Sequence, residues 1–231
     1  VDAAQQWTKI RKWSVGYLAI FAITSTTFAW DFIMSIDTHW YSTLFGWYVF
    51  SGMFITALTA IMLMVIFLKR QGYLQEVNKS HIHDMAKFMF AFSVFWTYLW
   101  FSQYMLIWYS NKPEESAYFL VRFMEFKGLL ITMLVMNFVF PILVLMSRDS
   151  KRNFGFILTA GIVILIGHWL DVYLMVYPGT VGATAGISLI NVGTFLGFVG
   201  LFIWIVFRAL ASSPLIPEKH PMYLESKYHH I

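Results

Sequence analysis

The chain has 231 residues, of which 59% are apolar, 19% aromatic and 12% charged. Together with a mean hydropathy of +0.65, this composition indicates a polytopic membrane protein rather than a soluble domain. The pI near 9.2 does not indicate a nucleic-acid partner, because the basic residues stand in short loops instead of one run. The sequence has no cysteine, which excludes disulfides and cysteine-ligated zinc or iron–sulfur clusters held by this chain.

Six apolar stretches are long enough to cross a bilayer, which takes about 20 residues. They run from Trp13 to Ile36, Leu44 to Leu68, Met85 to Trp108, Gly128 to Met146, Phe154 to Tyr177 and Gly186 to Leu210. We therefore predict an all-α membrane helical bundle with six transmembrane helices at 13–211, flanked by cytoplasmic segments at 1–12 and 212–231. The last segment reads as an extended arm that contacts a partner or is disordered. The start at Val1 favours a longer protein with a missing N-terminal portion.

Basic residues are sorted between alternate loops, and cytoplasmic loops hold an excess of Lys and Arg. Thirteen of the sixteen lie on one side: Lys9, Arg11, Lys12, Lys69, Arg70, Lys79, Lys87, Arg148, Lys151, Arg152, Arg208, Lys219 and Lys227. The other side has only Lys112, Arg122 and Lys127. Both ends of the chain are therefore predicted to be cytoplasmic.

Small residues and proline predict how the spans pack. Gly193 and Gly197 form a small-xxx-small pair, which favours close helix contact in lipid. Pro141 should kink the fourth span, and the glycine-rich stretch from Pro178 to Ala185 reads as a tight outer loop.

Ionisable groups at membrane depth are costly and are candidate functional residues. His168 and Asp171 stand three residues apart, which places them on one helix face. A carboxylate beside an imidazole can accept a hydroquinone proton, so both are candidates for a proton path and for quinone binding. The alternative is a buried ion pair that orders the bundle.

Two further carboxylates are proton-path candidates. Asp31 belongs to a polar row with Thr24, Thr27 and Ser35 along the first span, although threonine also bonds its own helix backbone without further function. Glu125 lies near the outer entrance of the fourth span, where the nearby Arg122 and Lys127 could neutralise it in a surface ion pair. No residue is assigned as catalytic.

A histidine-rich cluster lies at the inner edge of the third span. Its residues, His81, His83 and Asp84, have a spacing that is only a weak metal signal, because an exposed loop would satisfy these groups with water. No metal site is predicted. Asp37 and His39, at the outer end of the first span, are read as capping or partner-contact residues.

Two segments carry a resemblance. Ser35–Gly46, continued by Trp47–Gly52, is similar to a signature of NrfD-like (polysulfide reductase-type) membrane subunits. The segment Phe88–Met105, followed by Trp108 and Tyr109, is more specific. Together they resemble the second NrfD-like subunit of bacterial alternative complex III, a quinol:cytochrome c oxidoreductase, over most of the chain.

The resemblance implies a ten-helix subunit of two four-helix bundles and two flanking helices, of which this chain would be the C-terminal part. Spans two to five would then form one bundle, and Asp31 would belong to the other. It also implies menaquinol-type quinol as substrate and a bacterial inner-membrane location. The implied partners are a multihaem cytochrome c subunit, an iron–sulfur subunit, a second NrfD-like membrane subunit and lipids, with haem c and iron–sulfur clusters in those partners.

Two other classes stay open at this point. A secondary transporter would use polar groups at mid-depth to bind a solute or coupling ion, in folds with broken helices. A structural anchor would only hold redox partners at the membrane.

Overall fold

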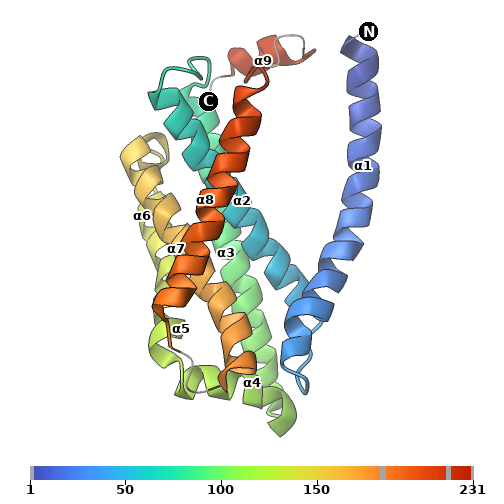
Figure 1. Cartoon of the computed structure of the whole chain (residues 1–231), viewed down its shortest axis with the longest axis vertical. Helices are drawn as coiled ribbons and strands as arrows, with labels where there is room; N and C mark the ends of the chain where they lie inside the picture. The colour runs from blue at the N-terminus through green and yellow to red at the C-terminus, as the bar shows by residue number, and fades with distance from the viewer. Residues whose placement is uncertain (1–2, 183–185, 217–219, 230–231) are drawn as a thin grey trace.

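The structure, a computed structural model, describes residues 3–182, 186–216 and 220–229 (Figure 1). Within these ranges the chain is helical and has no strand. Its α-helices are α1 (Ala3–Phe28), α2 (Phe45–Arg70), α3 (Lys79–Ser110), α4 (Pro113–Met124), α5 (Lys127–Leu134), α6 (Phe140–Leu145), α7 (Phe154–Thr180), α8 (Leu189–Ala211) and α9 (Tyr223–Lys227). The all-α fold is as predicted.

Five helical segments in the described part are long and apolar enough to cross a membrane. They are Gln5–Ile36, Phe45–Arg70, Lys127–Leu145, Phe154–Thr180 and Leu189–Ala211. The third predicted span, Met85–Trp108, also forms a helix, the 32-residue α3, but it is not among these five segments. Its tryptophans, tyrosines and polar residues lower its hydropathy, and at 1.5 Å per residue it is still about 48 Å long.

Four of the predicted spans pack around a common core: α2, α3, α7 and the broken helix α5–α6 (Figure 1). One apolar cluster, which contains Phe45 and Trp96, lies toward α4, and we call this end of the bundle the α4 side. A second cluster, which contains Met62 and Ile164, lies toward the other end, where the described chain begins and ends. We call that end the termini side.

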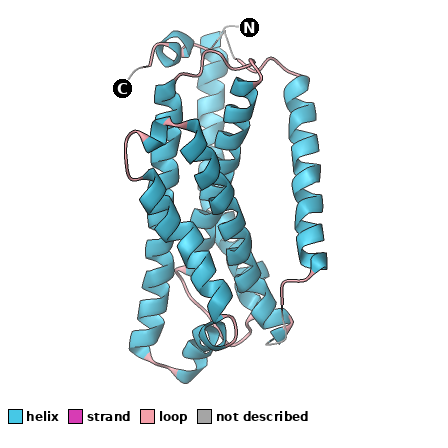
Figure 2. Cartoon of the chain, turned by 90° about the vertical axis from the view of Figure 1, so that its left-hand side faces the viewer, coloured by secondary structure: helices cyan, strands magenta, loops and turns pink. Residues whose placement is uncertain are grey.

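The first and last spans flank this bundle. α1 stands away from it along most of its length and approaches it near the α4 side (Figure 1). α8 runs alongside the bundle but apart from it (Figure 2), and none of its residues is buried. Two ring contacts connect α8 to its neighbours, Phe195 with Trp169 and Phe207 with Phe67.

The glycines that permit close helix contact are not those the sequence singled out. A Cβ at Gly193 or Gly197 would meet no atom within 4 Å, so the prediction of packing through this face is wrong for the described chain. A Cβ at Gly161 would instead lie 2.8 Å from the side chain of Leu63, and one at Gly167 would collide with Asn137. Tight approaches therefore surround α7, the central helix of the bundle, and a further one joins α2 to α1, where a Cβ at Gly46 would lie 2.6 Å from the side chain of Thr26.

Two spans are interrupted by π-helical turns. The turn η3 (Val135–Val139) ends two residues before Pro141 and separates α5 from α6, so the fourth span is irregular where the kink was predicted. The first span ends in a π-turn, η1 (Ala29–Ile33), and a 3₁₀ turn, η2 (Met34–Ile36). Pro178 lies inside α7 instead of in the predicted loop, because proline removes one helical bond without necessarily ending the helix. Residues 183–185 of that predicted loop lie outside the described residues.

Candidate functional site

The carboxylate of Asp171 is the centre of a buried polar cluster in the bundle. Its side chain is 2% exposed. The hydroxyl of Tyr48, on α2, donates to Oδ1 of Asp171, and the indole Nε1 of Trp96, on α3, donates to Oδ2 at 3.1 Å. Three helices thus contribute to one carboxylate, which satisfies it at a depth where an unpaired charge would be costly.

His168 completes this cluster from α7 itself. Its Nδ1 lies 3.7 Å from Oδ2 of Asp171, and its ring meets that of Trp96 edge-on. The predicted proximity of His168 and Asp171 on one helix face is therefore confirmed. Its Nε2 has no hydrogen-bond partner among the described residues, which leaves a position that can accept or donate a proton.

Further buried polar atoms without a described partner lie in the bundle. They belong to Thr59, Ser93, Gln103 and Asn137. Asn137 is fully buried in the π-turn η3, and such turns occur frequently at functional sites. Gln103 and Asp171 line the same cavity of about 20 Å³, which has room for about one water molecule.

The other two carboxylate candidates do not join this cluster. Asp31 is exposed on η1, and the hydroxyls of Thr24, Thr27 and Ser35 bond backbone carbonyls of their own helix. Glu125 is exposed at the end of α4. The structure therefore brings together His168 and Asp171 and leaves Asp31 and Glu125 on the surface of the described chain.

Arg122 is buried and pairs with Asp37, not with Glu125. Its Nη2 lies 3.0 Å from Oδ2 of Asp37. Pro178 has no backbone N–H, so the carbonyl of Leu174 lacks its helical donor, and Nε of Arg122 donates to it at 3.0 Å. The sequence suggested Glu125 because it is close along the chain, whereas the acceptors of α7 decide where this arginine lies.

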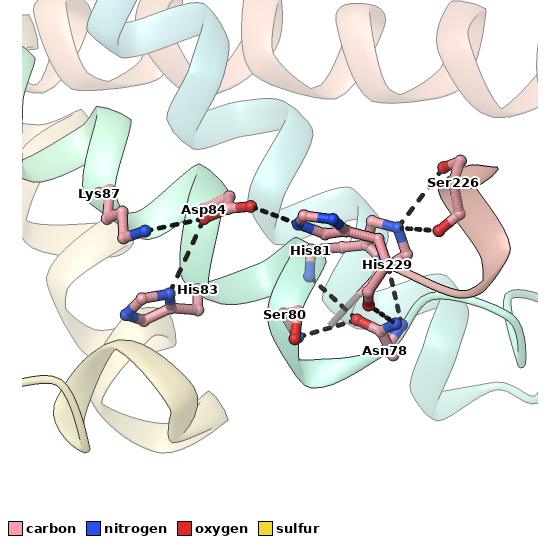
Figure 3. Close-up of polar contacts among 8 residues, drawn as sticks. All are labelled: Asn78, Ser80, His81, His83, Asp84, Lys87, Ser226 and His229. Atoms are coloured by element: carbon pink, nitrogen blue, oxygen red, sulfur yellow. Dashed lines mark hydrogen bonds and ion pairs between the residues drawn. The ribbon is translucent and has the colours of Figure 1, made fainter. Parts of the chain in front are cut away.

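The predicted histidine cluster belongs to the first turns of α3, not to an exposed loop (Figure 3). Asn78 caps the helix by accepting from the backbone N–H groups of Ser80 and His81. His83 is 4% exposed. Within the described residues, no three or more histidine, aspartate or glutamate side chains are arranged so that they could hold a metal ion.

The C-terminal tail folds back onto this turn. Nε2 of His229 lies 2.9 Å from Oδ2 of Asp84, and Nε2 of His81 lies 2.9 Å from the carbonyl of Ser226 (Figure 3). Nδ2 of Asn78 donates to the carbonyl of His229 at 2.7 Å. The tail is thus not an extended arm over residues 220–229, because α9 packs against the start of α3.

Charges on the termini side shift the pKa values of this region. Burial lowers the pKa of His83, aided by the positive charges of Lys87 and Arg152. Burial would raise the pKa of Asp84, but hydrogen bonds from His229 and Lys87 outweigh it and lower that pKa. At neutral pH Asp84 is therefore a carboxylate that holds the tail.

Several residues of the site were not singled out from the sequence. Tyr48 and Trp96 belong to spans that are rich in aromatic residues. Nothing in the sequence distinguishes them there from aromatic residues that only pack in the core. Gln103 and Asn137 carried a usable signal, because each is an amide inside an apolar span. Arg122 carried one as well, as one of only three basic residues on its predicted side.

No protein-family model matches the chain, and no curated protein matches it. The apolar helices define a multi-pass α-helical membrane protein. Its distinguishing feature is a buried carboxylate bonded by tyrosine and tryptophan, beside a histidine, in the centre of a four-helix arrangement.

Proposed function

We propose that the chain is an integral membrane subunit of a quinol:cytochrome c oxidoreductase complex of the alternative complex III type, or of one with another high-potential acceptor. In this proposal it supports quinol oxidation and carries protons through buried polar residues. The observation that supports it most is the Asp171 cluster, in which a buried carboxylate is held by Tyr48 and Trp96 next to His168. The resemblance of Ser35–Gly52 and Phe88–Met105 to NrfD-like subunits supports the same class.

The chemistry requires a proton acceptor within the membrane. Oxidation of a quinol to a quinone releases two electrons and two protons, and a buried carboxylate beside an imidazole can accept a proton. Asp171 in its ionised form already has two hydrogen-bond donors, while His168 has a free Nε2 among the described residues. The pair can therefore take up a proton and pass it on.

The size of the cavity beside Asp171 favours proton transfer over direct quinol binding. Its volume is about 20 Å³, whereas sites for small molecules span about 300–1,000 Å³. His168 and Asp171 are therefore proposed as proton carriers first, and the quinol, of menaquinone type, is proposed to bind elsewhere in the complex. Asp31 and Glu125 have no supporting contact for such a role.

Electrons would leave through partner subunits, because a chain without cysteine holds no cysteine-ligated cluster of its own. The proposed partners are a multihaem cytochrome c subunit, an iron–sulfur subunit, a second NrfD-like membrane subunit and lipids. The proposed location is the bacterial inner membrane with both termini of the chain cytoplasmic, since thirteen of its sixteen Lys and Arg residues lie on that side. The α4 side would then face outward.

A secondary transporter is the second candidate, and one observation favours it. The fourth span is broken by η3, and the buried amide of Asn137 has no partner among the described residues. Transporters bind substrates where helices are interrupted at mid-depth. The remaining alternative, a structural anchor, is supported only by the small volume of the cavity that Asp171 lines.

The first experiment is isolation of the native assembly in mild detergent and identification of its subunits by mass spectrometry. Co-purification of multihaem cytochrome and iron–sulfur subunits, with quinol oxidation by the assembly, is the expected result. Turnover in an Asp171→Asn variant should then fall at least tenfold while the subunits stay assembled. A chain isolated alone would overturn the proposal and favour the transporter, and unchanged turnover in Asp171→Asn would favour the anchor.

A further inference from the structure

Tyr118 and Arg122, both on α4, stand between two cavities. The smaller, of about 20 Å³, is lined by Asp171 and Gln103. The larger, of about 320 Å³, opens on the α4 side and is lined by Asp37 among others. Tyr118 and Arg122 are in the lining of both, so these two side chains form a shared wall of the two cavities.

We propose that the Arg122–Asp37 ion pair is a gate through which Asp171 exchanges protons with water on the α4 side. When the gate is closed, the wall keeps the two cavities apart. When the ion pair separates, water can connect them. A proton leaving Asp171 then passes to this water and on to bulk, and the carboxylate that remains keeps its hydrogen bonds from Tyr48 and Trp96.

The closed wall is built from several contacts. Nη1 of Arg122 donates to the carbonyl of Tyr118 at 2.9 Å, and Nη2 donates to the carbonyl of Met175 at 3.3 Å. The guanidinium also lies 3.3 Å from the centre of the Tyr118 ring. The indole of Trp40 stacks on this ring, with centroids 3.8 Å apart. Arginine, tyrosine and tryptophan thus form a continuous layer across the passage.

Asp37 is the movable half of the gate. Its side chain is 23% exposed, against 4% for Arg122, and it lies just past η2, outside the helices. Arg122 is bonded to carbonyls of α4 and α7, so it stays in place when the pair separates. Opening therefore requires the segment around Asp37 to move together with Trp40, which frees the Tyr118 ring from its stacking partner and lets it turn out of the passage.

Electrostatics connects the two sides of the wall through Tyr118. Burial raises the pKa of its hydroxyl to about 12, and the charges of Asp37 and Asp171 both contribute to the increase while Arg122 opposes it. The pKa of Tyr118 therefore depends on the charges of both carboxylates, Asp171 in the smaller cavity and Asp37 in the larger one. Its hydroxyl stays protonated at neutral pH, so it can donate and accept hydrogen bonds along the route.

Cysteine accessibility tests the gate directly, since the chain has no native cysteine. Met133 lines the smaller cavity and Ala117 the larger one, while Ile164 belongs to the core on the termini side. Each is changed to cysteine in the full chain, within sealed membrane vesicles. A membrane-impermeant methanethiosulfonate is then added to one side or the other, and modification of this chain is followed by mass spectrometry.

Met133→Cys should react slowly, and only from the side that labels Ala117→Cys. Adding Asp37→Asn should increase its rate at least tenfold, because the ion pair is lost, while Ile164→Cys stays unlabelled. Gly179→Ala provides a second way to open the gate, since its Cβ would lie 2.8 Å from Cγ2 of Ile36 and 3.2 Å from Oδ1 of Asp37 and would therefore displace the segment that carries Asp37. An unchanged rate in both backgrounds, with Ala117→Cys still reactive, would overturn the gate, as would labelling from the other side alone.

The use of the gate for protons rests on the proposed function, but the labelling experiment does not. Accelerated labelling in a chain that purifies without redox partners would leave the gate in place and remove the quinol oxidoreductase proposal. Unchanged labelling in a chain that belongs to a quinol-oxidising assembly would remove the gate and leave the quinol oxidoreductase proposal in place. The two proposals can therefore fail separately.

Discussion

The hydroxyl of Tyr48 donates a hydrogen bond to Asp171, a residue 123 positions away on another helix. Both side chains are buried, at 4% and 2% exposure. A buried carboxylate without donors would be protonated or would destabilise the fold. The contact from α2, together with that from α3, therefore makes an ionised Asp171 compatible with the interior of the bundle.

Removal of the second donor tests how much this arrangement stabilises the protein. In Trp96→Phe a six-membered aromatic ring remains, but Oδ2 of Asp171 loses the indole N–H, and the smaller side chain leaves a cavity at this fully buried position. A buried acceptor that loses its partner costs about 1–3 kcal/mol, so we expect a lower thermal midpoint of the purified protein in detergent. Trp47→Phe is the matched control, because Trp47 is 59% exposed and the change should stay within about 0.5 kcal/mol. Equal midpoints for the two variants would contradict the stabilising role of the indole.

The contact between α7 and η3 is tested with a pair of glycines. A Cβ at Gly167 would collide with the side chain of Asn137, whereas one at Gly193 meets nothing within 4 Å. Overpacking costs about 1–3 kcal/mol, so Gly167→Ala should lower the thermal midpoint. Gly193→Ala should leave it unchanged or raise it, since alanine favours helix by up to about 1 kcal/mol. The reverse order would show that α7 and η3 are not in close contact.

The sequence predicted the His168–Asp171 pair because a spacing of three residues on a helix is local information. It could not predict the donors to this pair. Tyr48 and Trp96 stand 123 and 75 residues from Asp171, and only the packing of three helices brings them together. The spans were predictable for the same local reason, since hydrophobic length is visible along the chain.

The partner of Arg122 was not predicted from the sequence, and the reason differs from that for Asp171. Proximity along the chain favoured an ion pair with Glu125, but burial of a guanidinium requires acceptors for all its N–H groups. Those acceptors include the carbonyl of Leu174, which is free because of Pro178. Each of these residues was visible in the sequence, while the relation between them depends on how α4 packs on α7.

The stability of this contact gives a third prediction. Arg122→Gln removes the charge that faces Asp37 and most of the donors to α4 and α7. Loss of one member of a fully buried ion pair costs about 3–5 kcal/mol. Because Asp37 is 23% exposed, the cost is smaller here, but a clear decrease of the thermal midpoint is expected. Lys127→Gln is the control, since Lys127 is exposed at the start of α5. A midpoint equal to that of the control would contradict the structural role of Arg122.

The docking of the tail depends on carboxylates whose pKa values are lowered. Hydrogen bonds from Tyr223 and Lys227 lower the pKa of Glu76, and the net effect on Asp84, against the opposing effect of burial, is also a decrease. A carboxylate with a lowered folded-state pKa contributes stability above its unfolded pKa, about 4, and loses it as the pH falls through the folded value. The docked tail should therefore be retained at neutral pH and released in acid.

A spin label at residue 224 can follow this release, because Leu224 on α9 is 65% exposed and the chain lacks competing thiols. With Leu224→Cys labelled, the nitroxide should be restricted at pH 7 and become mobile as the pH falls below about 4. The combination Glu76→Gln with Asp84→Asn should give a mobile label already at pH 7, since both carboxylates are absent. Lys112→Gln, on the α4 side, should leave the pH profile unchanged. A label that is equally mobile at both pH values in the parent chain would mean that these contacts do not hold the tail.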